Sequence, residues 1–93
     1  MIIGKTTSGF SFKIKKRVFH SMKVNKLIVK FNESPNTKEV LDVIYALLGK
    51  EQADAFLDHC DSMATDDKFG DEICNDGFAE IFEALNNDRD VKN

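Results

Sequence analysis

The amino-acid sequence predicts a small, mainly helical α+β domain, in which an N-terminal β-hairpin packs on a bundle of about four short helices. Three observations support this fold class. Apolar and polar residues alternate near the N-terminus, which is the period of a strand with one buried face. Apolar residues then recur every three or four positions, which is the period of a helix with one buried stripe. The 93 residues match the size of one small domain.

The hairpin is expected over residues 1–14, with its turn in the segment 4–9, which is rich in Gly, Ser and Thr. In the second strand, Phe10, Phe12 and Ile14 fall on one face, and the polar residues between them fall on the other. Since a two-stranded hairpin is marginally stable alone in water, we expect its phenylalanine face to rest on helices.

The first helical stripe follows Arg17 and consists of Val24, Leu27, Ile28 and Phe31. Val18, Phe19 and Met22 lie slightly out of phase with it, which indicates a kink or break near Lys23.

The start of the next helix has two interpretations. Ser34 can cap a helix whose first residue is Pro35, or Asn36 and Glu39 can form a capping box.

Two further stripes lie on either side of Gly49 and predict an αα-hairpin, two antiparallel helices joined by a very short corner. The glycine is expected to end the first helix in a left-handed conformation. The stripes are Val40, Leu41, Val43, Ile44, Leu47 and Leu48 before the glycine, and Ala53, Phe56, Leu57 and Cys60 after it.

The segment 61–70 is polar and is expected to be a loop before the last helix. Gly77 lies inside that helix, where glycine costs up to about 1 kcal/mol relative to alanine. Residues 86–93 have almost nothing to bury, so we expect a domain of residues 1–85 and a flexible tail of residues 86–93. The last stripe is Cys74, Phe78, Ile81, Phe82 and Leu85.

The charges are divided sharply along the chain. Residues 1–31 hold eight Lys and Arg and no acidic residue, whereas residues 32–93 hold five basic and all 16 acidic residues. The formal charges of the two parts are therefore +8 and −11. Such an asymmetry bears on the partners of a protein and not on its fold.

No constellation of residues indicates catalysis or a metal site. His20, His59, Cys60 and Cys74 lack the spacings of a zinc site, and the glycines of the acidic segment do not fit a calcium loop. No serine lies in a G-x-S-x-G turn, and no H-E-x-x-H helix or phosphate-binding loop is present. We therefore expect a protein that is not an enzyme and uses no cofactor.

The cellular compartment is expected to be the cytoplasm. The longest apolar run, residues 43–48, is far shorter than the roughly 20 residues of a membrane span. The N-terminal residues lack the layout of a signal peptide, and two cysteines suit a reducing compartment.

Nucleic-acid binding is an alternative function, because basic and aromatic residues interleave between Phe10 and Phe19. The alternation argues against it, since it places Phe10, Phe12 and Ile14 opposite the lysines. The acidic remainder would also repel a phosphate backbone.

Three segments in this order resemble the tail assembly chaperones of long-tailed, siphovirus-type bacteriophages that infect Gram-positive bacteria. They are "FSFKIKKRVF", "SPNTKEVLDVIYALLGKEQADAFLDHC" and "FAEIFEAL". The resemblance extends over about residues 10–93, and "ALLGKEQADAFLD" is its most specific part.

The resemblance implies a non-enzymatic role in the cytoplasm of the host cell. Members of this family bind and coat the tape-measure protein, help to recruit tail-tube subunits, and are absent from the mature virion. A small protein-interaction or regulatory module of phage or bacterial origin is the alternative.

The charge division also predicts self-association, because the basic end of one copy can meet the acidic part of the next. The other interpretation is that both charged parts are only solvated. The candidate partner-binding residues are the basic Lys13, Lys15, Lys16 and Arg17, and the apolar Phe31, Leu41, Leu48 and Phe56.

Overall fold

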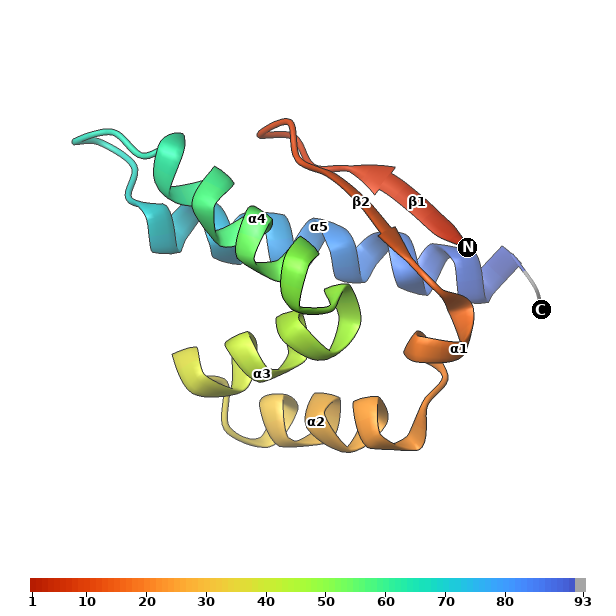
Figure 1. Cartoon of the computed structure of the whole chain (residues 1–93). Coiled ribbons are helices and arrows are strands. Elements are labelled where there is room, and N and C mark those ends of the chain that lie inside the picture. The colour runs from red at the N-terminus through yellow and green to blue at the C-terminus, as the bar shows by residue number, and fades with distance from the viewer. Residues whose placement is uncertain (92–93) are drawn as a thin grey trace.

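The computed structural model describes residues 1–91, with side chains over residues 1–87, and confirms the predicted α+β class (Figure 1). Two strands and five helices occur in this part of the chain. In order they are β1 (Ile2–Lys5), β2 (Ser11–Ile14), α1 (Lys16–Phe19), α2 (Met22–Glu33), α3 (Thr37–Leu48), α4 (Lys50–Ser62) and α5 (Gly70–Val91). Every helix over residues 1–91 is too short or too polar to cross a membrane.

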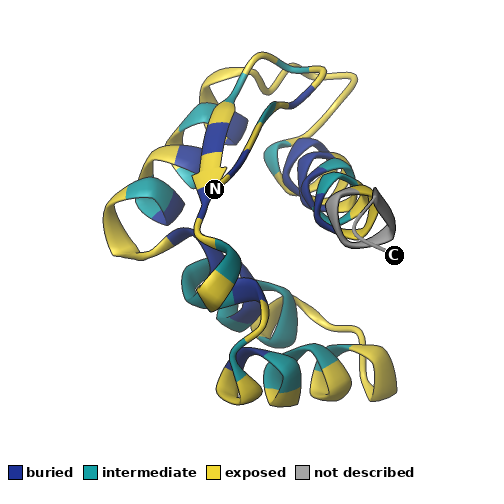
Figure 2. Cartoon of the chain, turned by 90° about the vertical axis from the view of Figure 1, so that its right-hand side faces the viewer, coloured by how far each residue is buried: buried dark blue, intermediate teal, exposed yellow. Residues whose placement is uncertain are grey.

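The strands pair antiparallel, with Ile2 opposite Ile14 and Gly4 opposite Phe12. Phe12 and Ile14 are buried, and Lys13 between them is exposed, as the alternation predicted. The buried side of α5 faces the hairpin and α4 (Figure 2), and α5 packs mainly against α4 and β1. The hairpin therefore does rest on helices.

The hairpin turn is tied to α4 and α5 by side-chain hydrogen bonds. Glu80 Oε1 accepts from the backbone N–H and the hydroxyl of Thr7, at 2.7 and 2.6 Å. On the other side, Ser8 Oγ lies 3.0 Å from His59 Nε2. These contacts join residues more than 50 positions apart and fix the turn over both helices.

The break after the hairpin falls at His20 and Ser21, slightly before the position near Lys23 that the sequence suggested. Ser21 Oγ accepts a hydrogen bond from the Val24 N–H at 3.5 Å and caps α2. A serine can satisfy a free N–H at a helix start and a lysine cannot, which explains the earlier break.

At the start of α3, the structure selects Asn36 over Ser34 as the capping residue. Asn36 Oδ1 accepts from the Glu39 N–H at 3.0 Å, and Pro35 stays outside the helix. Glu39 also brings a negative charge into the first turn, where it complements the helix dipole.

Gly49 forms the corner between α3 and α4 with φ 80° and ψ 163°. The positive φ was predicted, but the extended ψ differs from the expected left-handed helical conformation. This region of backbone space is accessible essentially to glycine alone. The corner is closed by Asp54, which accepts hydrogen bonds from the Tyr45 hydroxyl and, at 2.8 Å, from Lys50 Nζ.

The last helix is longer than the sequence suggested. α5 continues to Val91, so the domain boundary predicted at residue 85 lies inside a helix, and residues 86–91 are helical. Residues 92–93 lie outside the described part of the chain. Leu85 is the last buried residue among those whose side chains the structure describes, so the core does not account for this extension of the helix.

Phe56 is completely buried at the centre of the core and contacts Gly77 of α5 and Phe10 of the hairpin. Phe56 was predicted as a partner-binding residue, and in this structure its side chain has no exposed surface. The apolar stripe of α4 alone could not distinguish a core position from an exposed anchor.

Candidate partner-binding groove

An open apolar groove of about 760 Å³ runs between α5 and the junction of α2 with α3. It exists because α5 packs mainly on α4 and β1, whereas α2 packs mainly on α3. Its lining residues are Phe31, Pro35, Asn36, Thr37, Val40, Leu41, Asp71, Cys74, Asn75, Phe78, Ala79, Phe82, Glu83 and Asn86.

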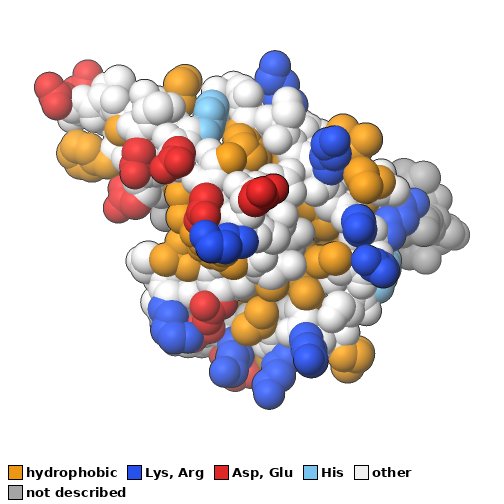
Figure 3. Space-filling view, in the orientation of Figure 1, with side chains coloured by type: hydrophobic (Ala, Val, Ile, Leu, Met, Phe, Trp, Pro, Cys, Tyr) orange, Lys and Arg blue, Asp and Glu red, His pale blue; other side chains and the backbone are white. Residues whose placement is uncertain are grey.

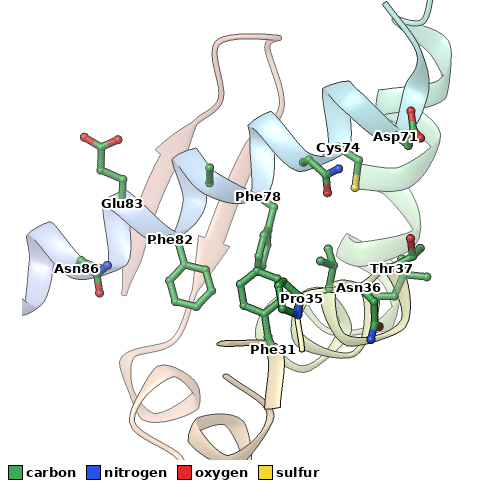
Figure 4. Close-up of a pocket in the computed structure, with 14 residues that line it drawn as sticks. Phe31, Pro35, Asn36, Thr37, Asp71, Cys74, Phe78, Phe82, Glu83 and Asn86 are labelled. Carbon is green, nitrogen blue, oxygen red and sulfur yellow. The ribbon is translucent and has the colours of Figure 1, made fainter. Parts of the chain in front are cut away.

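Three phenylalanine rings form the floor of the groove (Figure 4). The centroids of Phe31 and Phe78 are 5.4 Å apart, and those of Phe78 and Phe82 are 5.1 Å apart. Both pairs meet edge to face, with interplanar angles of 87° and 90°. Phe31 and Phe82 are only half-buried, so each offers ring surface to a ligand.

Two stripes of α5 explain how the helix serves both the core and the groove. Ile73, Ile81 and Leu85 are buried in the core. Cys74, Phe78 and Phe82 follow one another at intervals of four residues and line the groove. The apolar face of this helix is therefore wider than the core alone requires.

The charged side chains that line the groove are both acidic. Asp71 lies at one end, and Glu83 and Asn86 lie toward the other (Figure 4). Asp71 and Glu83 are exposed, and no Lys or Arg within residues 1–87 belongs to the lining. The groove thus combines aromatic and aliphatic contacts with an acidic rim.

Two of the predicted partner-binding residues lie in this groove. Phe31 contributes to its floor and Leu41 to its α3 wall, and both are half-buried. Lys16 is half-buried outside it. Leu48 is a buried core residue and lies outside the groove.

Leu48 belongs to a second hollow of about 840 Å³ beside the Gly49 corner, which we call the basic hollow. Three of the four predicted basic residues, Lys13, Lys15 and Arg17, line it with their side chains exposed. The full lining is Met1, Lys13, Lys15, Arg17, Val18, Ala46, Leu47, Leu48, Gly49, Lys50, Glu51 and Gln52. The predicted residues therefore divide between two surfaces.

Phe78 and Phe82 were predicted as core residues and were missed as groove residues. The available signal was the width of the apolar face of the last helix, where positions 74, 78 and 82 add a stripe beside positions 81 and 85. The period of the apolar residues indicates that one face of a helix is apolar, but it does not indicate which neighbouring element covers that face.

The two thiols lie against each other between α4 and α5. Burial raises the pKa of the Cys60 thiol to about 12, and burial also raises the pKa of Cys74. Both thiols are therefore protonated at neutral pH and poor nucleophiles. Among the residues the structure describes, no three His, Cys, Asp or Glu side chains come together as metal ligands.

Aromatic and basic side chains occupy opposite faces of β2. Phe12 is buried in the core, while Lys13 and Lys15 are exposed. A surface that binds single-stranded nucleic acid needs exposed rings beside its basic groups. This strand does not present them together.

No protein-family model, no curated protein and no solved structure matches this chain. The shape and chemistry of the groove are therefore the structural grounds for a function.

Proposed function

We propose that the protein is a non-enzymatic assembly chaperone that holds an amphipathic helix of a long partner chain in the groove. The observation that carries the proposal is the open apolar groove, in which the half-buried rings of Phe31 and Phe82 flank the buried ring of Phe78 and offer surface that an isolated small domain would normally cover. An amphipathic helix placed in an apolar groove is a recurring mode of peptide recognition.

The rim specifies the chemistry of the partner. Asp71 and Glu83 favour a helix that carries Lys or Arg beside its apolar stripe. Opposite charges at the rim raise the association rate and select the register of the helix, while the apolar floor supplies most of the affinity.

The sequence resemblance supplies the identity of the partner. In the proposed function, the partner chain is the tape-measure protein of a long-tailed phage, which this protein binds and coats in the host cytoplasm. It then helps to recruit tail-tube subunits and is absent from the mature virion. A groove for one helix suits this role, because many copies can occupy successive helical segments of one long chain.

The same groove would also serve a small interaction or regulatory module with a different helical partner. The two functions differ in the partner and not in the surface. Co-expression with a phage tape-measure protein distinguishes them, since only the chaperone should co-purify with it and keep it soluble.

The groove itself is tested with single substitutions. Phe82→Asp and Leu41→Asp each place a charge on the groove lining and should weaken binding of a tape-measure segment about tenfold or more. Val29→Asp is the matched control, since Val29 is an exposed apolar residue of α2 that does not line the groove. Equal binding by all four proteins would refute the proposal.

Cys74 provides an independent readout of where the partner sits. This thiol lines the groove, whereas the neighbouring Cys60 is 1 % exposed and does not. A bound helix should slow alkylation of Cys74 in proportion to occupancy. Alkylation of Cys74 that is unchanged at saturating partner would place the binding site elsewhere.

A further inference from the structure

The basic hollow has an apolar floor and a cationic rim. Val18, Ala46 and Leu47 lie in the floor, and Lys13, Lys15 and Arg17 stand around it. Lys50 and Glu51 also line the hollow: the Lys50 ammonium group already contacts Asp54 at 2.8 Å, and the single carboxylate of Glu51 leaves the rim with an excess of positive charge. This surface suits an apolar side chain that is flanked by carboxylates.

The loop between α4 and α5 presents such a group, and we call residues 63–69 the acidic tip. All seven of its residues are exposed, and among them Phe69 and Met63 expose 59 % and 47 % of their surface. Asp66 and Asp67 lie between these two apolar residues. Figure 3 shows acidic side chains where this loop protrudes, and Lys and Arg gathered over other parts of the same face.

The acidic tip is held in one shape by its own hydrogen bonds. Thr65 Oγ1 accepts from the backbone N–H groups of Asp67 and Lys68, at 3.2 and 3.1 Å. The Thr65 N–H donates to the Lys68 carbonyl at 2.8 Å. The one base of the tip, Lys68, is paired with Asp76 at 2.7 Å, so its charge is compensated. A preformed loop loses little conformational entropy on binding.

We propose that the basic hollow binds the acidic tip of a second copy of this chain, with Phe69 in the apolar floor and Asp66 and Asp67 against Lys15 and Arg17. The tip and the hollow match in both charge and polarity. A nucleic acid would satisfy the cations but presents a phosphate backbone, not an apolar group, to the floor. The hollow is separate from the acid-rimmed groove, so this inference can fail without affecting the proposed function.

The contact joins two different surfaces and is therefore heterologous. Each bound copy keeps one free hollow or one free tip, so copies add head to tail unless the chain closes into a ring. The attraction is between exposed charges. Dissolved salt weakens such attraction, and at 0.1 M ionic strength it is largely screened beyond about 10 Å. Association should thus increase with protein concentration and decrease with ionic strength.

Sedimentation velocity of the full chain at low salt tests the inference. The hollow variant Lys15→Glu/Arg17→Glu and the tip variant Phe69→Ser should each associate about tenfold or more weakly than the parent chain. Lys23→Glu/Lys26→Glu and Met22→Ser are the matched controls, because they make the same changes at exposed positions of α2 away from both surfaces. The controls should associate like the parent.

Mixing the two variants gives the sharpest result. The hollow variant keeps an intact tip and the tip variant keeps an intact hollow, so the mixture should form a 1:1 heterodimer that cannot grow further. Melting curves of each variant verify that it is folded.

Several outcomes would overturn the inference: a parent chain that stays monomeric at low salt, association that grows stronger in 1 M salt, or folded variants whose mixture does not pair. Binding of a single-stranded oligonucleotide that only the hollow variant loses, in the absence of self-association, would assign the hollow to nucleic acid instead.

Discussion

Gly77 shows how a single residue is selected by its neighbour in space. A β-carbon at this position would lie 2.9 Å from two ring atoms of Phe56, which has no exposed surface and no room to move. We expect Gly77→Ala to destabilise the fold by about 1–2 kcal/mol. Overpacking costs about 1–3 kcal/mol, and this outweighs the roughly 0.5–1 kcal/mol that alanine gains in a helix. Thermal or urea unfolding measures the change.

A double-mutant cycle isolates the cause. In a Phe56→Leu background the ring edge is gone, so Gly77→Ala should become neutral or stabilising there. A Gly77→Ala chain that is more stable than the parent would show that the packing argument is wrong.

Gly49 and Gly77 also mark what the sequence could and could not reveal about single residues. The corner at Gly49 was predictable because two apolar stripes stop and restart around one glycine. The need for glycine at position 77 was not predictable, because it comes from contact with the ring of Phe56, which lies 21 positions away on another helix. For the same reason Phe56 resembled a possible anchor, although it is the centre of the core.

At the scale of elements, α3 and α4 are joined by the cluster of Tyr45, Lys50 and Asp54 around the Gly49 corner. Hydrogen bonds from Lys50 and then Tyr45 hold the pKa of the Asp54 carboxyl below its ordinary value of 3.8. The same bonds raise the pKa of Lys50 above 10.5 and that of Tyr45 above 10.0.

The stabilisation from this cluster should depend on pH at both extremes. The contribution of Asp54 to the free energy of unfolding is fully present above the pKa of this group in the unfolded chain. It is lost as the pH falls through the lowered pKa of the folded protein. The contributions of Lys50 and Tyr45 are fully present below the pKa values of these groups in the unfolded chain. They are lost as the pH rises through the raised pKa values of the folded protein. Asp54→Asn should therefore lower the melting temperature most near neutral pH, and the difference from the parent should shrink at both extremes.

The control for this pH profile is Glu33→Gln, which removes an exposed carboxylate at the end of α2, away from the Gly49 corner and from both proposed binding surfaces. The difference caused by Asp54→Asn should be small and should decline in high salt, because the groups are solvent-exposed. A difference that stays constant from acid to alkaline pH would show that the cluster contributes no charge-dependent stability.

The order and type of the elements could be predicted because each carries its own period. The contacts between the elements could not be predicted in the same way, because several of them are hydrogen bonds between polar groups far apart in the sequence. Gln52 is an example: its amide accepts from the Lys13 N–H at 2.8 Å and donates to the Lys13 carbonyl at 2.9 Å, which closes the outer edge of β2. Phe31 and Leu41 of the groove were among the predicted partner-binding residues, but the position of the groove escaped prediction, since it is the space left between α5 and the α2–α3 pair.

At the scale of the whole molecule, the groove and the basic hollow share only α3. Val40 and Leu41 in its first half line the groove, and Ala46 to Leu48 at its end line the hollow. Copies joined through hollow and tip would each keep a free groove. A row of such copies can bind several helices of one long partner, and linking binding events in this way raises the apparent affinity without any new contact.

This arrangement predicts a difference between short and long ligands. The hollow variant Lys15→Glu/Arg17→Glu should bind a single amphipathic peptide as tightly as the parent, because its groove is intact. For a partner with several such helices its apparent affinity should fall about tenfold or more, because the copies no longer support one another. Phe82→Asp should instead weaken the binding of both the short peptide and the long partner. Binding isotherms at low and high salt measure both effects, and high salt should reduce the parent to the level of the hollow variant on the long partner alone. An equal loss on both ligands would mean that the basic residues contact the partner directly and that the two surfaces act as one.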